Sequence, residues 1–340
     1  MPLRLITLAL IVMIIGVSCY SGIVSVIKEL IENYVVMYKS PSAWNNRGVE
    51  YVTGKRVSQN YSEAVKWFRK AAKQGDTMAQ RNLGLIYAMG KGVPQNNNKA
   101  IQWFRKAAEK NDAVSELNLG IMYKDGLGIQ QNDSEAIKWI HKAAEQGFPD
   151  AERSLGILYL TAKGVQQNHT EAFKWIRKAA EKEDAIAQYN LAVMYVTGKG
   201  VQQNDAEAVT WFRKAGEHGD LIAQRTLGLM YATGSNVQPN EFQAMKWFFL
   251  AAKQGDPMAQ YNIAMGFLNG KGVTRNNTEA LKWLHLAANQ GFPQAQYALA
   301  ALYHDGVYVP QNGMEAIKWL RKAAAQGHLK AQERLQALGQ

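Results

Sequence analysis

The chain has 340 residues but only one cysteine, Cys19. A disulfide needs two thiols, so the chain cannot be crosslinked internally, and a small scaffold stapled by disulfides is excluded. The six histidines are scattered and have no cysteine or carboxylate partners at metal-ligand spacing. The sequence therefore predicts no metal site.

Motifs for catalysis are also lacking. A nucleophile, a general base or a phosphate-cradling loop should interrupt a regular sequence pattern rather than follow it. The glycines of Gly90-Lys91-Gly92 instead return at a fixed interval, which indicates turns and not a nucleotide-binding loop. We therefore expect a protein that is not an enzyme, with no cofactor and no small-molecule substrate.

What the sequence does contain is a strict repeat. Eight of the nine tryptophans follow one another every 36 residues, without insertion or deletion, and only Trp44 stands outside the series. Self-similarity at such a period predicts a repeat architecture. The members of the series are Trp67, Trp103, Trp139, Trp175, Trp211, Trp247, Trp283 and Trp319.

Each unit of the repeat predicts two amphipathic helices. The first, helix A, is typified by residues 78–88, and the second, helix B, by residues 62–73. Apolar residues recur in both at helical spacing, and residues 90–96 supply the glycine, proline and asparagine of a turn followed by an N-cap. The tryptophans, and tyrosines such as Tyr87, are predicted to lie in the core.

Small residues have their own places in the unit. Most helices B are followed by a glycine such as Gly75, which suits a left-handed C-terminal cap, while Asn111 and Glu183 stand at this position in two units. Gly84 and its counterparts in helix A are Gly or Ala, so we expect a neighbouring helix to approach closely there. We expect the tryptophan to fill the adjoining space.

These columns resemble the Sel1-like repeat family, a relative of the tetratricopeptide repeats. The shared pattern is Ala-x-x-x-Leu-Gly-x-x-Tyr, then Gly-x-Gly-Val, then Ala-x-x-Trp-x-x-Lys-Ala-Ala-x-x-Gly, and it covers eight units from about Ser40 to the C-terminus. Departures at Ala162 and at residues 235–239 affect the predicted loop shape only. The resemblance implies an all-α, right-handed α-solenoid of helix-turn-helix repeats and an adaptor role, and the single cysteine excludes the disulfide-rich secreted members.

The domain organisation follows from the repeat. Each unit buries its surface only against its neighbours, so we expect one elongated domain. We assign residues 1–28 to a signal peptide or membrane anchor and 29–39 to a linker or amphipathic segment. Residues 40–327 form the eight repeats, and residues 328–340 form a C-terminal capping helix.

The N-terminal segment has no charged residue from Leu5 to Ile27, and Arg4 precedes it. This order is typical of an uncleaved membrane anchor, of a cleaved signal or of a bacterial lipoprotein, in which Cys19 after Gly16-Val17-Ser18 is the candidate for lipidation. An apolar helix without targeting value is the remaining alternative. We expect export, with the repeats in the periplasm or held at the membrane, or else secreted.

The chain has a net charge of +11, and its basic residues cluster on helix B, for example at Lys66, Arg69 and Lys70. One interpretation is a solvated face whose lysines pair with glutamates three residues before them. The alternative is attraction of anionic lipid, acidic partners or nucleic acid. We do not expect nucleic acid, because no aromatic stacking platform accompanies the basic residues and the protein is predicted to be exported.

Two departures from the repeat are candidate binding sites. The first lies on helix B of repeats 6 and 7, where the basic pairs give way to Phe249, Leu250 and Leu286. Consecutive repeats stack, so these residues should form one exposed apolar patch, which favours an interface. The alternative is that they are ordinary scattered surface residues.

The second candidate is a column of helix A rich in arginine and tyrosine, which are favoured at protein interfaces. It lies beside a floor of apolar residues such as Leu85 and Leu229, and we expect a groove that holds a peptide or helix. The alternative is a floor that packs between repeats and side chains that are only solvated. The predicted binding residues are Arg81, Arg153, Tyr189, Arg225, Tyr261 and Tyr297.

The function predicted from the sequence is a scaffold that binds proteins or peptides and reaches a membrane through its N-terminal segment. Two alternatives remain open. One is an accessory regulator of an envelope enzyme or membrane complex, and the other is a basic surface for anionic lipid or nucleic acid.

Overall fold

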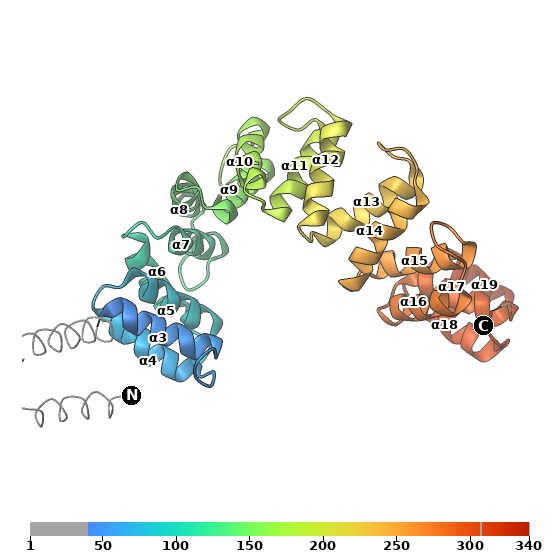
Figure 1. The fold of residues 1–340 in the computed structure, drawn as a ribbon, viewed down its shortest axis with the longest axis horizontal. Helices are drawn as coiled ribbons and strands as arrows, with labels where there is room; N and C mark the ends of the chain where they lie inside the picture. Colours follow the sequence, from blue (N-terminus) through green and yellow to red (C-terminus); the bar gives the residue numbers. More distant parts are fainter. Residues whose placement is uncertain (1–39, 307, 340) are drawn as a thin grey trace, which may run out of the picture. The chain divides into compact units, whose positions relative to one another are not determined.

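The computed structural model describes residues 40–306 and 308–339, and every regular element in these two ranges is an α-helix (Figure 1). The predictions for residues 1–28, for 29–39 and for Cys19 lie outside the described residues. None of the described helices is both long and apolar enough to cross a membrane. The helices are α3 (Pro41–Thr53), α4 (Tyr61–Lys73), α5 (Thr77–Met89), α6 (Asn97–Ala108), α7 (Ala113–Asp125), α8 (Asp133–Glu145), α9 (Pro149–Thr161), α10 (His169–Glu181), α11 (Ala185–Thr197), α12 (Asp205–Glu217), α13 (Leu221–Thr233), α14 (Glu241–Lys253), α15 (Pro257–Asn269), α16 (Asn277–Asn289), α17 (Pro293–Asp305), α18 (Gly313–Ala325) and α19 (Leu329–Ala337).

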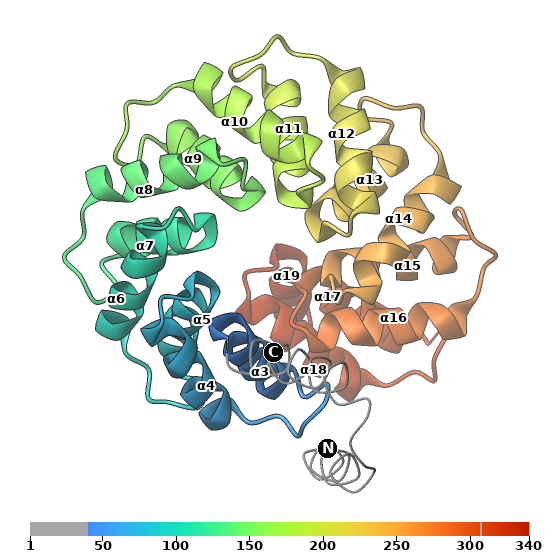
Figure 2. The ribbon, with the colours of Figure 1, turned by 60° about the vertical axis from the view of Figure 1, so that its left-hand side comes forward.

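The helices fall into two compact units that divide inside α8, between Trp139 and Ile140. In both units the odd-numbered helices are the predicted helices A and the even-numbered ones are the helices B. Within the second unit, α11, α13, α15 and α17 lie on the inner side of the stack and α10, α12, α14 and α16 on the outer side (Figure 2). The prediction of an all-helical repeat solenoid is confirmed.

The column of small residues in helix A, Gly or Ala in each repeat, lets the two helices of one repeat pack closely. A methyl group on Gly84 would lie 2.5 Å from the ring of Phe104, and one on Gly228 would lie 2.5 Å from the ring of Phe248. The residue that fills the space is therefore the one directly after the tryptophan, and our prediction of the tryptophan itself was wrong. Helical geometry explains the difference, because adjacent residues on a helix point about 100° apart.

The tryptophans and tyrosines are less buried than predicted. Trp175, Trp247 and Trp319 are buried, whereas the other five tryptophans of the series are half-buried. Tyr87 is buried, but Tyr123 and its later counterparts are half-buried. Amphipathic rings at a junction between repeats keep one edge at the surface, so helical periodicity alone overestimated their burial.

The turns keep one shape even where the sequence departs from the repeat. Asn111, Ala162, Glu183 and Asn236 all adopt the left-handed backbone that glycine adopts in the other units, with φ between 54° and 66°. Each helix B from α4 to α18 begins after an asparagine, such as Asn60, whose side chain accepts a hydrogen bond from the backbone three residues on. The departures in the fourth and sixth repeats therefore leave the loop intact.

A ladder of buried side chains in the second unit links each helix A to the helices B on either side of it. Gln224, for example, donates to the carbonyl of Gly216 in the preceding helix B and accepts from Gln254, at the end of its own repeat, at 2.9 Å. Related contacts join Gln188 to His218, Gln260 to Gln290 and Gln296 to Gln326. At one rung the pair is ionic instead, with Lys182 2.7 Å from Glu152.

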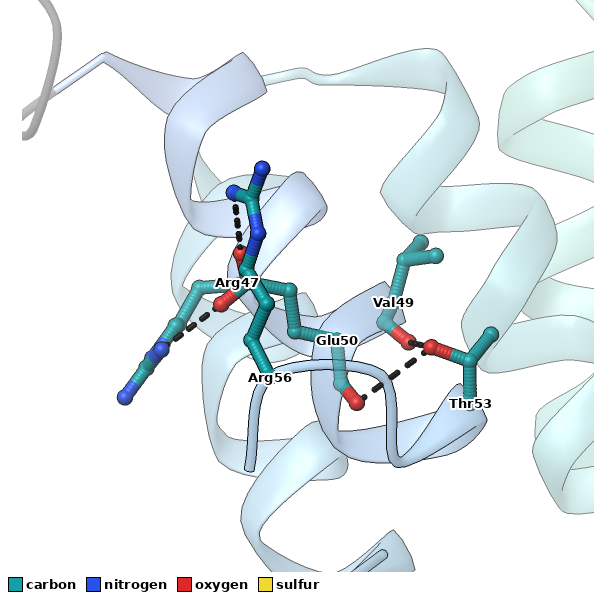
Figure 3. Close-up of polar contacts among 5 residues, drawn as sticks. All are labelled: Arg47, Val49, Glu50, Thr53 and Arg56. Atoms are coloured by element: carbon teal, nitrogen blue, oxygen red, sulfur yellow. Dashed lines mark hydrogen bonds and ion pairs between the residues drawn. The ribbon is translucent and has the colours of Figure 1, made fainter. Parts of the chain in front are cut away.

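The first described helix, α3, carries a polar network at its C-terminal end (Figure 3). Glu50 accepts from Arg47 at 2.6 Å and from Arg56 at 3.0 Å, and the hydrogen bond from Arg47 holds the pKa of Glu50 below its ordinary value. The hydroxyl of Thr53 donates to the carbonyl of Val49 at 3.0 Å. These contacts hold the turn that leads into α4.

Candidate functional site

A hollow with a mainly apolar lining lies on the helix A side of the second unit, at the C-terminal end of the repeats. We call it the C-terminal groove. It has a volume of about 720 Å³ and is formed by α15, α17, α19 and the turn before α19. Its lining consists of Tyr261, Met265, Leu268, Pro293, Gln294, Tyr297, Ala298, Ala301, Leu302, Gln326, Gly327, His328, Leu329 and Lys330.

Two of the predicted binding residues, Tyr261 and Tyr297, line this groove. The ring of Tyr261 packs at a tilt against Phe292, with centroids 5.7 Å apart, and the ring of Tyr297 stacks on His328 at 4.8 Å. Burial raises the pKa of Tyr261, so its phenol stays neutral and keeps its hydrogen as a donor. The groove is thus bounded by aromatic rings held in place by the next repeat.

The other predicted residues of this column are engaged between repeats. Arg81 forms an ion pair with Asp112 at 3.0 Å, and Arg225 forms one with Asp256 at 2.8 Å. Arg153 pairs in the same way with Asp184 at 3.0 Å. Their guanidinium groups tie one helix A to the N-terminus of the next, so the structure does not bring them into the C-terminal groove.

Tyr189 also packs within the protein, with its ring 5.6 Å from that of Phe212. The column therefore joins successive helices A through its three arginines, whereas Tyr189 packs inside its own repeat. Only at Tyr261 and Tyr297 does it border an open hollow. The sequence found the column but could not separate these two roles, because the partners, such as Phe212 for Tyr189 and Asp112 for Arg81, lie on other helices.

Four residues of the groove were missed from the sequence. Met265 and Ala301 continue the apolar floor column of Leu85 and Leu229, so extending that column by two repeats would have found them. His328 and Lys330 belong to the capping helix, which we had expected only to close the array. Their part in the groove depends on how α19 packs against α17, which no local pattern reveals.

The predicted apolar patch on helix B is smaller than expected. Phe249 is half-buried, with its ring 6.1 Å from Phe267 and 6.0 Å from Trp283, and Leu250 is half-buried as well. Only Leu286 is exposed, to 49%. The expectation of full exposure was wrong for the first two, because Phe249 packs against the following repeat and Leu250 packs against the core cluster that includes Phe212 and Trp247.

The position of Phe249 elsewhere holds an arginine that donates to a tyrosine of the next helix A. Arg105 contacts the hydroxyl of Tyr123 at 3.0 Å, and Arg213 contacts that of Tyr231 at 3.2 Å. At the junction of repeats 6 and 7, Phe249 stands in place of the arginine and Phe267 in place of the tyrosine. This paired change replaces a hydrogen bond by an aromatic contact.

The basic residues of helix B are partly engaged too. Lys178, Lys214 and Lys322 lie over the ring of the tryptophan three residues before them, at 3.9, 4.1 and 4.3 Å from its centroid. Lys66 pairs with Glu63 at 2.5 Å and Lys174 with Glu171 at 2.6 Å, as predicted for spacing of three residues. The outer face is therefore less strongly basic than its lysine count suggests.

Among residues 40–306 and 308–339, no three His, Cys, Asp or Glu side chains gather into a group that could hold a metal ion. His285 packs beside Tyr303 and Trp319, and burial lowers its pKa. It therefore serves as a neutral packing residue at a repeat junction.

Comparison with known proteins agrees with this architecture. The Sel1 repeat model matches eight consecutive segments, namely 42–76, 77–112, 113–148, 149–184, 185–220, 221–256, 257–292 and 293–328. The chain belongs to the Sel1 repeat family. Sel1 repeat proteins generally act as scaffolds for protein interactions, and their fold is typically not enzymatic.

Two solved structures of Sel1 repeat proteins are similar to the chain. One is c5321, a protective antigen of uropathogenic Escherichia coli strains, with 36% identity over 88% of this chain and a TM-score of 0.78. The other is a Sel1 repeat protein from Oxalobacter formigenes, with 32% identity over 88% of this chain and 86% of its own length, and a TM-score of 0.65. The chain spans 64% of the length of the Escherichia coli protein. No match was found among curated proteins.

Proposed function

We propose that this Sel1 repeat protein is a non-enzymatic scaffold that binds a segment of a partner protein in the C-terminal groove. The observation that carries the proposal is the hollow of about 720 Å³, which Tyr261 and Tyr297 border and whose floor is apolar. Sites that bind ligands are concave, mostly apolar and furnished with a few polar groups. Tyrosines are enriched at protein interfaces because each offers a large rigid ring and a hydrogen-bonding hydroxyl.

The apolar side chains available to a partner support this proposal. Leu329 is 72% exposed at the edge of the groove, and Met265, Ala298 and Ala301 are half-buried on its floor. Covering such surface is favourable by about 25 cal/mol per Å². A partner segment gains this energy without unfolding the scaffold, because the floor belongs to well-formed helices.

A photocrosslinking amino acid placed at Ala298 in the full chain tests the proposal in cells. We expect covalent adducts with a small set of proteins. Asn190 occupies the same column of α11 and is equally half-buried, so it is the matched control site. Adducts of equal yield at both sites would contradict the proposal.

A blocking variant sharpens the same experiment. In Ala298→Trp the new ring fills the groove. With the crosslinking amino acid moved to a position beside the groove, the yield of adducts with the same proteins should fall at least about tenfold. Asn190→Trp adds the same ring outside the groove and should capture normally. Both variants should keep the helical circular dichroism of the parent chain.

The cellular location of the protein is proposed from its sequence alone. We propose export, with residues 1–28 as an anchor or signal and Cys19 as a lipidation site if the segment is a lipoprotein signal. Membrane fractionation of the full chain and of Cys19→Ser distinguishes these forms. Loss of membrane association in Cys19→Ser supports lipidation, whereas unchanged association supports an uncleaved apolar anchor.

A further inference from the structure

The helix N-termini at the C-terminal groove differ from most others in the repeats. Five helices A begin after an aspartate that accepts a hydrogen bond from their first turn, namely Asp76, Asp112, Asp184, Asp220 and Asp256. At α17 and α19 the corresponding residues are Phe292 and His328, and neither side chain makes a cap hydrogen bond. Both helices begin at the groove, through Pro293, Gln294, Leu329 and Lys330.

The loss of these two aspartates changes the charge of the site. A helix N-terminus carries unsatisfied N–H groups and a partial positive charge, which a capping carboxylate normally offsets. In the C-terminal groove this offset is absent at two adjacent helices. The lining contains no aspartate or glutamate, and its one formally charged side chain is the cation of Lys330.

The residue that contacts the cap position from the previous helix A also differs between these helices and the others. Where the cap is Asp112 or Asp256, the contacting residue of the previous helix A is an arginine, Arg81 or Arg225. Where the cap is Phe292 or His328, that residue is Tyr261 or Tyr297. The aromatic pairs keep the repeats together and leave the helix N-termini without a negative partner.

We propose that the partner segment supplies this negative charge, so that the C-terminal groove selects apolar residues flanked by aspartate or glutamate side chains. The apolar side chains cover Met265, Ala298 and Ala301, and the carboxylate lies near Lys330 and the N-termini of α17 and α19. The inference rests on the proposed function, since it specifies the chemistry of the segment that occupies that same groove.

Selection from a random-peptide display library on the full chain tests this specificity. We expect the enriched peptides to combine leucine-like residues with aspartate or glutamate and to lose binding to Ala298→Trp. On Lys330→Glu the acidic peptides should bind at least about tenfold more weakly, because a repulsive charge replaces an attractive one. Lys163→Glu, an exposed lysine outside the groove, is the control and should bind normally.

A second variant places the missing carboxylate back in the protein. His328→Asp should cap α19 as Asp256 caps α15 but gives up the stacking on Tyr297, so the chain should keep its helical circular dichroism while acidic peptides bind more weakly. Peptides displayed with a free and with a blocked C-terminus separate side-chain carboxylates from the terminal one. Binding that needs only the free terminus would overturn the inference.

The outcomes also separate this inference from the proposed function. Enriched peptides that depend on the groove but contain no acidic residues would overturn the inference and leave the scaffold proposal standing. Absence of any peptide whose binding is lost in Ala298→Trp would count against both.

Discussion

At the scale of single residues, the informative positions are those that keep the backbone of the repeat with an unfavourable side chain. Glu183 adopts a φ of 66°, whereas its counterpart in the next repeat, Gly219, adopts 91° at a site with no atom within 4 Å of an added Cβ. A left-handed backbone costs a residue with a Cβ about 1–2 kcal/mol. The turn is thus retained at the expense of stability.

We predict that Glu183→Gly raises the free energy of unfolding by about 1 kcal/mol, because glycine adopts this backbone without strain. Urea denaturation followed by circular dichroism measures the change. Glu183→Ala is the control for loss of the charge and should give little gain. Gly219→Glu should shift the urea midpoint in the opposite direction, and a neutral result there would contradict the explanation by strain.

Ser115 offers a second test at this scale. Its side chain is fully buried at a position where most repeats have alanine, and its hydroxyl has no hydrogen-bond partner among the described residues. An unsatisfied buried hydroxyl costs about 1–3 kcal/mol, so Ser115→Ala should raise the thermal midpoint. Ser154→Ala is the control, since its hydroxyl donates to the carbonyl of Asp150 at 2.6 Å, and it should give no gain.

At the scale of helices and their junctions, residues of adjacent repeats change in pairs. Arginine faces tyrosine between α12 and α13, whereas Phe249 faces Phe267 between α14 and α15. We predict that Phe249→Arg lowers the free energy of unfolding by about 1–2 kcal/mol, because the arginine meets an aromatic ring without an acceptor. Adding Phe267→Tyr should recover part of the loss.

A double-mutant cycle on these two residues gives the coupling energy, which we expect to be about 0.5–1 kcal/mol in favour of the matched pair. Additive effects would show that the paired change has no energetic basis. Leu286→Lys, by contrast, alters an exposed side chain and should leave the urea midpoint unchanged. It is therefore the suitable variant for testing whether this part of helix B contacts a partner.

The ladder between repeats gives a further prediction for this scale. Glu152 is 2% exposed and pairs with Lys182, whereas the rungs at Gln224, Gln260 and Gln296 join two glutamines. Lys182→Met should destabilise the chain by about 2–4 kcal/mol, because it leaves a buried carboxylate without its cation. Glu152→Gln combined with Lys182→Gln rebuilds the neutral rung and should be at least as stable as the parent in urea denaturation.

The sequence predicted the helices and turns because helical spacing and cap residues act within a few neighbours along the chain. It also found Tyr261 and Tyr297. It could not predict that Arg81, Arg153 and Arg225 form ion pairs with aspartates, since those contacts form only when successive helices A stack. For the same reason it overestimated the exposure of Phe249 and Leu250.

At the scale of the whole molecule, the net charge of +11 suggests binding to polyanions, but many basic side chains of the outer face already have partners. Lysines lie over tryptophan rings or pair with glutamates, as Lys214 and Lys174 do. We predict that the full chain elutes from heparin below about 0.3 M salt, where screening removes weak surface attraction. Retention at much higher salt would favour the basic-surface alternative.

The paired contacts between repeats also bear on how such a chain can evolve. Unequal recombination can delete or duplicate a whole repeat without disturbing the period of the array, because the tryptophans from Trp67 to Trp319 recur every 36 residues. Loss of residues 257–292, however, which include α15 and α16, would set Phe249 against Tyr303 in place of Phe267. The repeats are similar in length but not interchangeable, because a deletion would pair side chains that do not match across the new junction.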